Sequence, residues 1–194
     1  GTPEDLEHGE TRLLMGRTRN LFLPTPLDMT TPHDRERGYY CPMVQSNAYM
    51  IRAALGMPAE AALSPVLNLR ADPGMLALDL HAQMGHRLGV GAGRVRRALK
   101  HALDRQDRFV KELHRVGDHI LQRIGTTEPL VVVTGRPYNL YDERLNLRLG
   151  RSLANIGLAA LPMDLIEVSR IHLGDFVSMY WGLGAQILRT ARLI

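Results

Sequence analysis

The chain has 194 residues, of which 45% are hydrophobic and 23% charged, a composition typical of an ordinary globular protein. No apolar run approaches the roughly 20 residues that a membrane-spanning helix needs, and the first residues lack the basic-then-apolar order of a signal peptide. The single cysteine excludes an intrachain disulfide framework, which favours a cytoplasmic location. The net charge of +4 comes mainly from arginine. It favours either an anionic partner or a solvated basic face, and nucleic acid is disfavoured because basic and aromatic residues do not interleave.

The order of predicted elements divides the chain into four parts and indicates an α/β fold. Residues 1–20 begin with a polar stretch and are predicted to be a linker. Residues 21–90 form a first α/β lobe that contains Cys41, and residues 91–125 form a long connecting helix. Residues 126–194 form a second α/β lobe, which we expect to be incomplete because the sequence ends without a polar tail.

Strands and helices alternate in the first lobe. Residues 21–23 are apolar and are closed by Pro24 and Pro26, which predicts a short strand followed by a loop that runs to Gly38. The elements predicted after Cys41 are a helix over residues 43–55, a strand at residues 64–69, a turn at residues 72–74 and a helix over residues 75–88.

Cys41 lies directly before the first of these helices. Pro42 favours an extended backbone at the preceding residue, and it suits the first turn of a helix because that position needs no hydrogen-bonded N–H. A helix N-terminus stabilises a thiolate, which is the form that binds metals or attacks electrophiles. The alternative is that Cys41 is a small buried hydrophobic residue.

The strongest periodic signal lies between Arg94 and Ile124. Apolar residues recur there at spacings of three and four, which predicts one helix of about 30 residues with a buried stripe. The members of the stripe are Val95, Leu99, Ala102, Gln106, Phe109, Leu113, Val116, Ile120 and Ile124. Basic residues occupy the outer faces, so the simplest interpretation is an amphipathic helix with a solvated basic face that joins two lobes.

The second lobe begins with an apolar run rich in β-branched residues at positions 129–134, typical of a strand covered on both faces in a parallel sheet. Asp142 is a suitable N-cap for a helix that ends at Gly157, and residues 158–161 form the next strand. This order predicts a parallel βαβ unit. A final helix is predicted to begin near Phe176.

The loop after the first strand of the second lobe is the best candidate binding surface, because ligands of open α/β sheets lie beyond the carboxyl ends of the strands. Gly135 lets the backbone turn and approach a ligand, and Arg136 can pair with a phosphate or carboxylate. Tyr138 and Asn139 offer directional hydrogen bonds. The loop lacks the Lys-Ser/Thr pair of a phosphate-binding loop, and the alternative interpretation is a simple turn.

Other patterns are less informative. Residues 89–93 are glycine-rich, but no strand precedes them, so they are predicted to connect two helices. The histidines do not show zinc-binding spacing. A nucleophilic enzyme built on Cys41 would need a histidine close in space, for which His33 and His172 are candidates. A four-iron cluster takes three or four thiolates, so a cluster at Cys41 would need ligands from outside this chain.

Four strings of residues together resemble a known family. They are Tyr-Cys-Pro-Met-Val-Gln at residues 40–45, Gly-Arg-Pro-Tyr at residues 135–138, Leu-Pro-Met-Asp at residues 161–164 and Tyr-Trp-Gly-Leu-Gly at residues 180–184. In this order they resemble the domain that accompanies the ATPase modules in large activase proteins of the 2-hydroxyacyl-CoA dehydratase system. That domain is itself similar to the iron-sulfur subunits of 2-hydroxyglutaryl-CoA and benzoyl-CoA-type enzymes.

The resemblance implies two Rossmann-like three-layer lobes with parallel strands that flank a [4Fe-4S] cluster, with Cys41 as one cluster ligand. It also implies an actin-like ATPase module, in the same parent protein or in a partner subunit, that passes a low-potential electron to the cluster-bearing protein. This sequence contains neither the other ligand cysteines nor the ATPase segment. The isolated fragment is therefore expected to be catalytically inactive and free of the cluster.

These observations leave three functional hypotheses. The first is a fragment of a CoA-substrate-specific enzyme activase-related protein that takes part in ATP-linked electron transfer. The second is a non-redox α/β module in which Arg136 binds the phosphates of an acyl-CoA, a coenzyme A thioester. The third is an interaction scaffold whose basic helix, from Arg94 to Arg115, docks an acidic partner or nucleic acid. A second copy of the chain is a further candidate partner.

Overall fold

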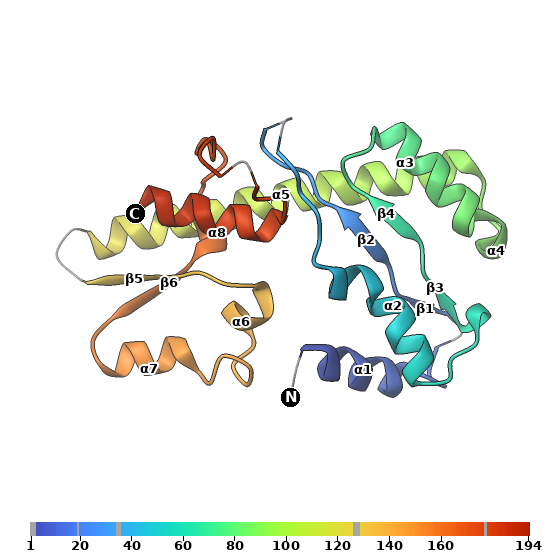
Figure 1. Ribbon diagram of the computed structural model, residues 1–194, viewed down its shortest axis with the longest axis horizontal. Helices are drawn as coiled ribbons and strands as arrows, with labels where there is room; N and C mark the ends of the chain where they lie inside the picture. The colour runs from blue at the N-terminus through green and yellow to red at the C-terminus, as the bar shows by residue number, and fades with distance from the viewer. Residues whose placement is uncertain (1–2, 19, 34–35, 126–128, 177) are drawn as a thin grey trace. The chain divides into compact units, whose positions relative to one another are not determined.

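The computed structural model describes residues 3–18, 20–33, 36–125, 129–176 and 178–194. These residues form a mixed α/β structure with three sheets of two parallel strands each (Figure 1), which confirms the predicted α/β class. The chain divides into two compact units. Residues 1–103 and 180–182 form unit 1, and residues 104–179 and 183–194 form unit 2. The first two residues of the predicted linker and the predicted start of the second lobe at 126–128 lie outside the described residues.

Two lengths of extended chain run side by side in unit 1. The first contains β1 (Leu21–Phe22) and β2 (Thr25–Asp28), and the second contains β3 (Ala62–Leu63) and β4 (Val66–Asn68). β1 pairs with β3, and β2 pairs with β4. The amide of Leu23 donates to the carbonyl of Leu63 at 2.8 Å, which bridges the two short sheets. β1 and β4 confirm the two strands predicted for this lobe.

β2 lies where the sequence predicts a loop, so that prediction is wrong over residues 25–28. The loop was expected because Pro24 precedes this stretch and Pro26 lies within it. β2 has a single neighbour in its sheet, and an edge strand tolerates a proline that lacks an N–H. The amide of Thr25 donates to the carbonyl of Pro65 at 2.8 Å, so strand pairing begins between the two prolines.

α1 (Pro3–Leu14) lies within residues 1–20, the stretch that is predicted to be a linker, so most of this stretch is helical. Thr11 is buried and Arg12 lies in the last turn, a favourable position for a positive charge at a helix C-terminus. A helix that buries only a narrow face can be polar in composition, which is why the sequence gives little sign of it.

α2 (Pro42–Ala54) confirms the helix predicted after Cys41. Cys41 is the N-cap residue, with φ of −55° and ψ of 141°, and Pro42 lies in the first turn as expected. Ala48 and Ile51 are buried, which agrees with the apolar spacing in the sequence.

The helix predicted over residues 75–88 is divided. Its parts are α3 (Pro73–Leu80), a π-helical segment (His81–Gly85) and α4 (His86–Leu88). The carboxylate of Asp72 caps α3, and Gly89 ends α4 with a left-handed φ of 63°. Residues 89–91 connect α4 to the next helix, which begins at Ala92, so the predicted helix-to-helix connection is confirmed over this shorter range.

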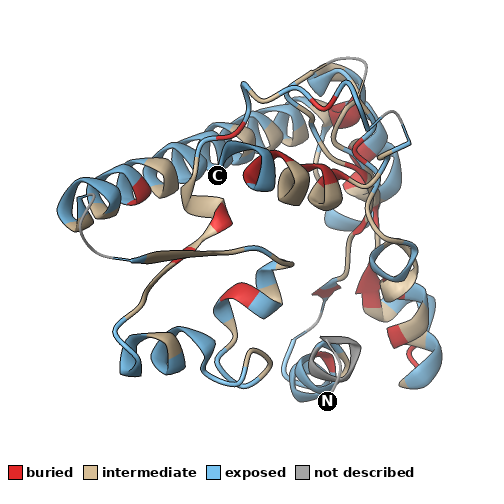
Figure 2. Cartoon of the chain, turned by 60° about the vertical axis from the view of Figure 1, so that its left-hand side comes forward, coloured by how far each residue is buried: buried red, intermediate tan, exposed pale blue. Residues whose placement is uncertain are grey.

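α5 (Ala92–Ile124) confirms the long predicted helix and has 33 residues. The predicted buried stripe is wrong in the middle of this helix, where residues 104–112 are all exposed. Figure 2 shows that much of α5 is exposed. Phe109, a member of the predicted stripe, is 57% exposed. Gly117 is buried instead. Periodicity identifies the apolar face of a helix, but it does not reveal whether another element covers that face.

β5 (Leu130–Val133) and β6 (Ala159–Pro162) are the parallel pair of unit 2, as predicted. Their register runs from Leu130 opposite Ala159 to Val133 opposite Pro162. α7 (Leu149–Asn155) connects them along the chain and packs against β6. The predicted βαβ unit is therefore present.

The helix predicted from Asp142 to Gly157 is wrong over its first half. α6 (Pro137–Tyr141) ends just before Asp142, whose carboxylate accepts hydrogen bonds from two amides of the following turn at 2.8 and 2.9 Å. Leu147 and Arg148 then have left-handed φ values of 54° and 58°. A right-handed helix cannot continue through such residues, so α7 begins only at Leu149.

The last helix, α8 (Gly182–Leu193), begins later than the predicted start near Phe176. Trp181 forms a β-bridge, so its backbone is extended and cannot join the helix. Among the described residues, no helix combines the length and the apolar character that crossing a membrane requires.

Each unit has a small core of its own. In unit 1, Leu21, Met57 and Ala62 form a buried cluster. In unit 2, Leu161 and Met163 have no exposed surface. Leu161 lies near the carboxyl end of β6, and Met163 directly follows the strand. The carboxyl end of β6, which lies at the same edge of the sheet as the predicted binding loop, is therefore packed into the core of unit 2.

Candidate functional site

Backbone hydrogen bonds hold the segment that leads to Cys41 on both sides. Within unit 1, Tyr39 forms an antiparallel bridge with Asp28 and a parallel bridge with Trp181. The Tyr39 amide donates to the carbonyl of Tyr180 at 2.9 Å, and the Tyr39 carbonyl accepts from the amide of Gly182 at 3.1 Å. The residue directly before the string at residues 40–45 is therefore paired with the string at residues 180–184, which is far away in the sequence.

Two glycines allow these segments to approach so closely. A β-carbon at Gly38 would lie 2.5 Å from the carbonyl oxygen of Met29 and 2.9 Å from Oδ1 of Asp28. A β-carbon at Gly182 would overlap the thioether of Met29. Neither glycine has a left-handed φ. Glycine is therefore needed at position 38 for space, because the nearest atom is a backbone oxygen, whereas at position 182 the flexible side chain of Met29 would have to move.

Cys41 is half-buried at the start of α2. Its carbonyl accepts a hydrogen bond from the amide of Gln45 at 3.0 Å, and Nε2 of Gln45 donates to the carbonyl of Tyr40 at 2.7 Å. The first turn of α2 is thereby tied to the residues before Cys41. The position expected for Cys41 at a helix N-terminus is confirmed, and its role as a metal ligand stays a prediction.

Three polar side chains are associated with the segment that leads to Cys41. They are the phenol of Tyr40, the carboxylate of Asp28 and the guanidinium of Arg70. Burial and, second, the carboxylate of Asp28 raise the pKa of Tyr40. Asp28 is itself buried, and its Oδ2 lies 4.0 Å from Nε of Arg70. None of these groups is a thiolate or an imidazole, the soft and borderline ligands that accompany cysteine at most metals.

The donor set of this chain by itself does not fit a [4Fe-4S] cluster. Such a cluster takes three or four thiolates in general, and Cys41 is the single cysteine of the sequence. In the part of the chain that the structure describes, no three His, Cys, Asp or Glu side chains are grouped so as to hold a metal ion. Cys41 can therefore supply at most one ligand of a metal site.

The predicted binding loop follows the carboxyl end of β5 in unit 2. Arg136 is the N-cap residue of α6, Arg136 and Tyr138 are half-buried, and Asn139 is exposed. The carbonyl of Arg136 accepts hydrogen bonds from the amides of Asn139 and Leu140 at 2.8 and 3.1 Å. A β-carbon at Gly135 would make ordinary contacts at 3.7 Å, so the turn itself does not require glycine there. Contact between this loop and a ligand stays a prediction.

Three further polar side chains meet beside this loop, and the sequence did not single them out as site residues. Tyr141 is the last residue of α6, Asp164 lies in the turn at Met163–Leu165 that follows β6, and Gln186 lies on α8. The hydroxyl of Tyr141 donates to the carboxylate of Asp164, and Nε2 of Gln186 donates to Asp164 Oδ1 at 3.1 Å. The Asp164 carboxylate thus joins the predicted binding loop to the end of β6 and to α8.

This carboxylate and its phenol partner have shifted pKa values. Partial burial and, second, the charge of Asp164 raise the pKa of Tyr141 to about 12. Burial raises the pKa of Asp164, although hydrogen bonds from Tyr141 and Gln186 and the nearby His114 act in the opposite direction. Tyr141 is 51% exposed, so solvent weakens the energetic effect of its shift. At neutral pH Tyr141 is a neutral hydrogen-bond donor.

A second polar pair lies close to Asp164. Nδ1 of His114, on α5, is 3.1 Å from Oε2 of Glu167. Gly117 lies one turn further along α5, and a β-carbon there would overlap the backbone carbonyl of Leu165. The missing side chain lets the backbone of α5 approach the segment after β6, which places His114 beside Glu167.

The edge formed by the carboxyl ends of β5 and β6 therefore offers a phenol donor, a carboxylate acceptor, an amide and a guanidinium. This set can bind the polar groups of a ligand. Asp164 is the last residue of the Leu-Pro-Met-Asp string that contributes to the family resemblance, so the sequence could have indicated it as a site residue. Tyr141, His114 and Gln186 belong to no recognised motif. Cys41 lies in unit 1 and this edge lies in unit 2, so the structure presents two candidate sites.

Comparison with known proteins gives one match. Residues 2–166 match the family model described as the CoA enzyme activase uncharacterised domain. This range contains Cys41, the loop at residues 135–139 and Asp164. No curated protein and no solved structure matches the chain significantly.

Proposed function

The chain belongs to the family of the CoA enzyme activase uncharacterised domain, and from this premise we propose that it is an accessory domain in ATP-linked, low-potential electron transfer. The ATP-consuming partner is an activase ATPase module, located in the same parent protein or in a partner subunit. The proposal extends the resemblance to the iron-sulfur subunits of 2-hydroxyacyl-CoA dehydratases, and it locates the system in the cytoplasm.

One observation carries this proposal. The segment before Cys41 is paired on one side with the end of β2 and on the other side with Trp181. Backbone pairing on both sides, together with the hydrogen bonds from Gln45 to the carbonyls of Cys41 and Tyr40, holds the cysteine at a defined and half-buried position. A cysteine that only fills space in a hydrophobic core does not need its backbone to be held by pairing on both sides.

Cys41 supplies one thiolate of a shared [4Fe-4S] cluster in this proposal, and the other thiolates come from outside this chain. When bound, such a cluster accepts and donates single electrons at low potential. The contribution of the chain is to hold the Cys41 thiolate at the N-terminus of α2, where the helix dipole favours negative charge.

The test compares the protein with its Cys41→Ser variant. Each is combined with the activase ATPase module, reconstituted anaerobically with iron and sulfide, and analysed for iron content and for charge-transfer absorbance. We expect the variant to lose most of the cluster. Ser46→Ala, one turn into α2, is the matched control and should keep it. Equal iron content in the Cys41→Ser variant and the unmodified protein would remove Cys41 from the site.

A second candidate function is binding of an acyl-CoA at the loop of residues 135–139. The observation that favours it is that this loop lies at the carboxyl edge of a parallel strand pair and is held there by Asp164 through Tyr141. In this role Arg136 would pair with a phosphate of the coenzyme A thioester, and Tyr138 and Asn139 would add hydrogen bonds.

Calorimetry with acetyl-CoA tests this second function. Arg136→Ala should weaken binding by about tenfold or more, because a hydrogen bond to a charged group is lost. Arg144→Ala removes the same charge from an exposed position on the turn after α6 and serves as the control. Absence of heat at millimolar acetyl-CoA would count against the acyl-CoA role.

Both functions are compatible with the expected Rossmann-like three-layer arrangement of the two lobes. What supports that arrangement is the parallel pairing of β1 with β3, β2 with β4 and β5 with β6. Parallel pairs require crossover connections, which normally place helices on the faces of a sheet.

A further inference from the structure

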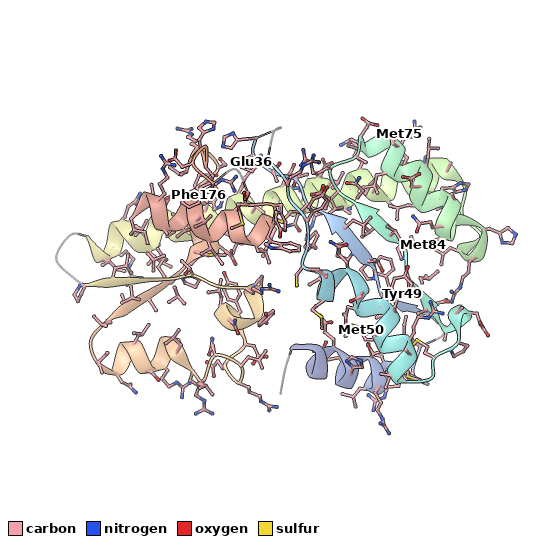
Figure 3. The ribbon with its side chains drawn as sticks, viewed as in Figure 1. Glu36, Tyr49, Met50, Met75, Met84 and Phe176 are labelled. Atoms are coloured by element: carbon pink, nitrogen blue, oxygen red, sulfur yellow. The ribbon has the colours of Figure 1, made fainter. Side chains whose placement is uncertain are left out.

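A cavity of about 320 Å³ lies in unit 1, and neither Cys41 nor the loop at residues 135–139 contributes to its lining. Arg52 contributes from the last turn of α2, and Ser64 from the link between β3 and β4. The π-helical segment contributes Gln83 and Met84, the latter labelled in Figure 3, and α4 contributes Arg87. The remaining lining residues are apolar, so the cavity combines an apolar wall with a small number of polar groups.

Two of these polar groups have unused hydrogen-bonding capacity. Nε of Arg52 and Oγ of Ser64 are buried, and neither has a hydrogen-bond partner in the described part of the chain. Arg52 also forms no ion pair with any residue that the structure describes. A buried donor without an acceptor destabilises a protein, so a bound acceptor would relieve a cost that is already present.

Arg87 adds a second positive charge. Its guanidinium donates to the carbonyl of Ala62 at 2.7 Å, to Oδ1 of Asn20 at 2.8 Å and to the carbonyl of Glu60. All three acceptors are neutral. The described residues that line the cavity include two arginines and no carboxylate. The cavity therefore carries positive charge that no lining residue balances.

We propose that this cavity binds the phosphoryl group of a small phosphorylated molecule. A phosphoryl group carries close to two negative charges near neutral pH and several strong acceptor oxygens, so it matches two guanidinium groups and one hydroxyl donor. A carboxylate carries one charge and would leave the second arginine unbalanced. The cavity is at the low end of the size of ligand pockets, and it suits a phosphate on a short organic group in contact with Met84 and Pro65.

This inference goes beyond the proposed function. The two candidate sites described above depend on Cys41 and on Arg136, whereas the cavity depends on Arg52, Ser64 and Arg87. Its failure would leave the electron-transfer role and the acyl-CoA role unaffected, and their failure would leave the cavity unaffected.

The test is isothermal calorimetry of the full chain with inorganic phosphate, glycerol 3-phosphate, coenzyme A and acetate. We expect phosphate and glycerol 3-phosphate to bind and acetate to bind at least about tenfold more weakly, because it carries half the charge. Arg52→Gln should weaken phosphate binding by about tenfold or more, and Ser64→Ala by several-fold. Arg96→Gln removes the same charge from an exposed position of α5 in the same unit and should leave binding unchanged.

Thermal unfolding gives a second readout that also monitors folding. Addition of phosphate should raise the midpoint for the unmodified protein and for Arg96→Gln, and it should have little effect on Arg52→Gln. The proposal is overturned if no phosphate compound binds at millimolar concentration, if acetate binds as tightly as phosphate, or if Arg96→Gln weakens binding as much as Arg52→Gln. It is also overturned if coenzyme A binds through Arg136 while both small phosphates fail to bind.

Discussion

Gly117 of α5 lies directly against the backbone carbonyl of Leu165, the last residue of the turn that follows β6. A glycine inside a long helix lowers helix stability, and the sequence contains no other reason for one at this position. The contact explains it, because a side chain at position 117 would separate α5 from the segment that contains Asp164 and Glu167.

Gly117→Ala should therefore destabilise the protein. Overlap with a backbone carbonyl forces a shift that costs about 1–3 kcal/mol, and the gain in helix propensity offsets about 1 kcal/mol of it. Gly93→Ala is the matched control, because it lies in the same helix and a β-carbon there would contact only the guanidinium of Arg97 at 3.8 Å. Urea unfolding measures both. Equal free energies of unfolding for the two variants would contradict the close packing at position 117.

Gln83→Ala should destabilise the edge of β4. The side chain of Gln83 accepts from the amide of Val66 at 2.7 Å and donates to its carbonyl at 3.1 Å, so it replaces the neighbouring strand that this edge lacks. Gln83 is exposed, and water can replace part of the interaction, so we expect a loss of about 1 kcal/mol in the free energy of unfolding. Gln106→Ala, an exposed position on α5, should change it by less than about 0.5 kcal/mol. Hydrogen exchange of the Val66 amide should accelerate only in the first variant.

Asp164→Asn and Glu167→Gln should change the pH dependence of stability in opposite directions. The pKa of Asp164 is raised above 3.8 in the folded protein, mainly by burial, so its favourable contribution is complete below 3.8 and is lost as the pH rises through the folded value. The pKa of Glu167 is lowered below 4.5, mainly by a hydrogen bond from Ser169, so its contribution is complete above 4.5 and is lost as the pH falls through the folded value.

Unfolding free energies from pH 3 to pH 7 would separate the two carboxyl groups. Relative to the unmodified protein, Asp164→Asn should gain stability as the pH rises, whereas Glu167→Gln should lose stability as the pH rises. Differences that run in the same direction for both variants would show that Asp164 is not the more desolvated of the two carboxyl groups.

Tyr141→Phe should remove a tyrosine titration at strongly alkaline pH. The pKa of Tyr141 is raised to about 12, so its contribution to stability is complete below the ordinary value of 10.0 and is lost as the pH rises through about 12. The difference in phenolate absorbance between the protein and the variant should therefore have a midpoint well above 10. Tyr49→Phe, an exposed tyrosine of α2, provides the comparison. A difference midpoint near 10 for Tyr141 would mean that its hydroxyl does not face Asp164.

The local structure around Cys41 could be predicted from adjacent residues. Pro42 limits the backbone of the residue before it, and the spacing of Ala48 and Ile51 indicates a helix, so both the cap and α2 follow from short-range rules. The same holds for β5, β6 and the long helix α5. Short-range rules did not predict that the helix expected from Asp142 to Gly157 is interrupted. Leu147 and Arg148 adopt the left-handed conformation, which is rare for non-glycine residues, and nothing in the sequence marks them.

The sequence alone determined where α2 and α5 lie, that β5 and β6 are parallel strands and where the only thiol lies along the chain, because these properties depend on near neighbours. Tertiary structure alone decided that Tyr39 pairs with Trp181, that Asp164 binds Tyr141 and Gln186, and that the middle of α5 stays exposed. Such contacts join segments that are distant in sequence. They depend on which surfaces meet when the chain packs, and no periodicity within one segment records that choice.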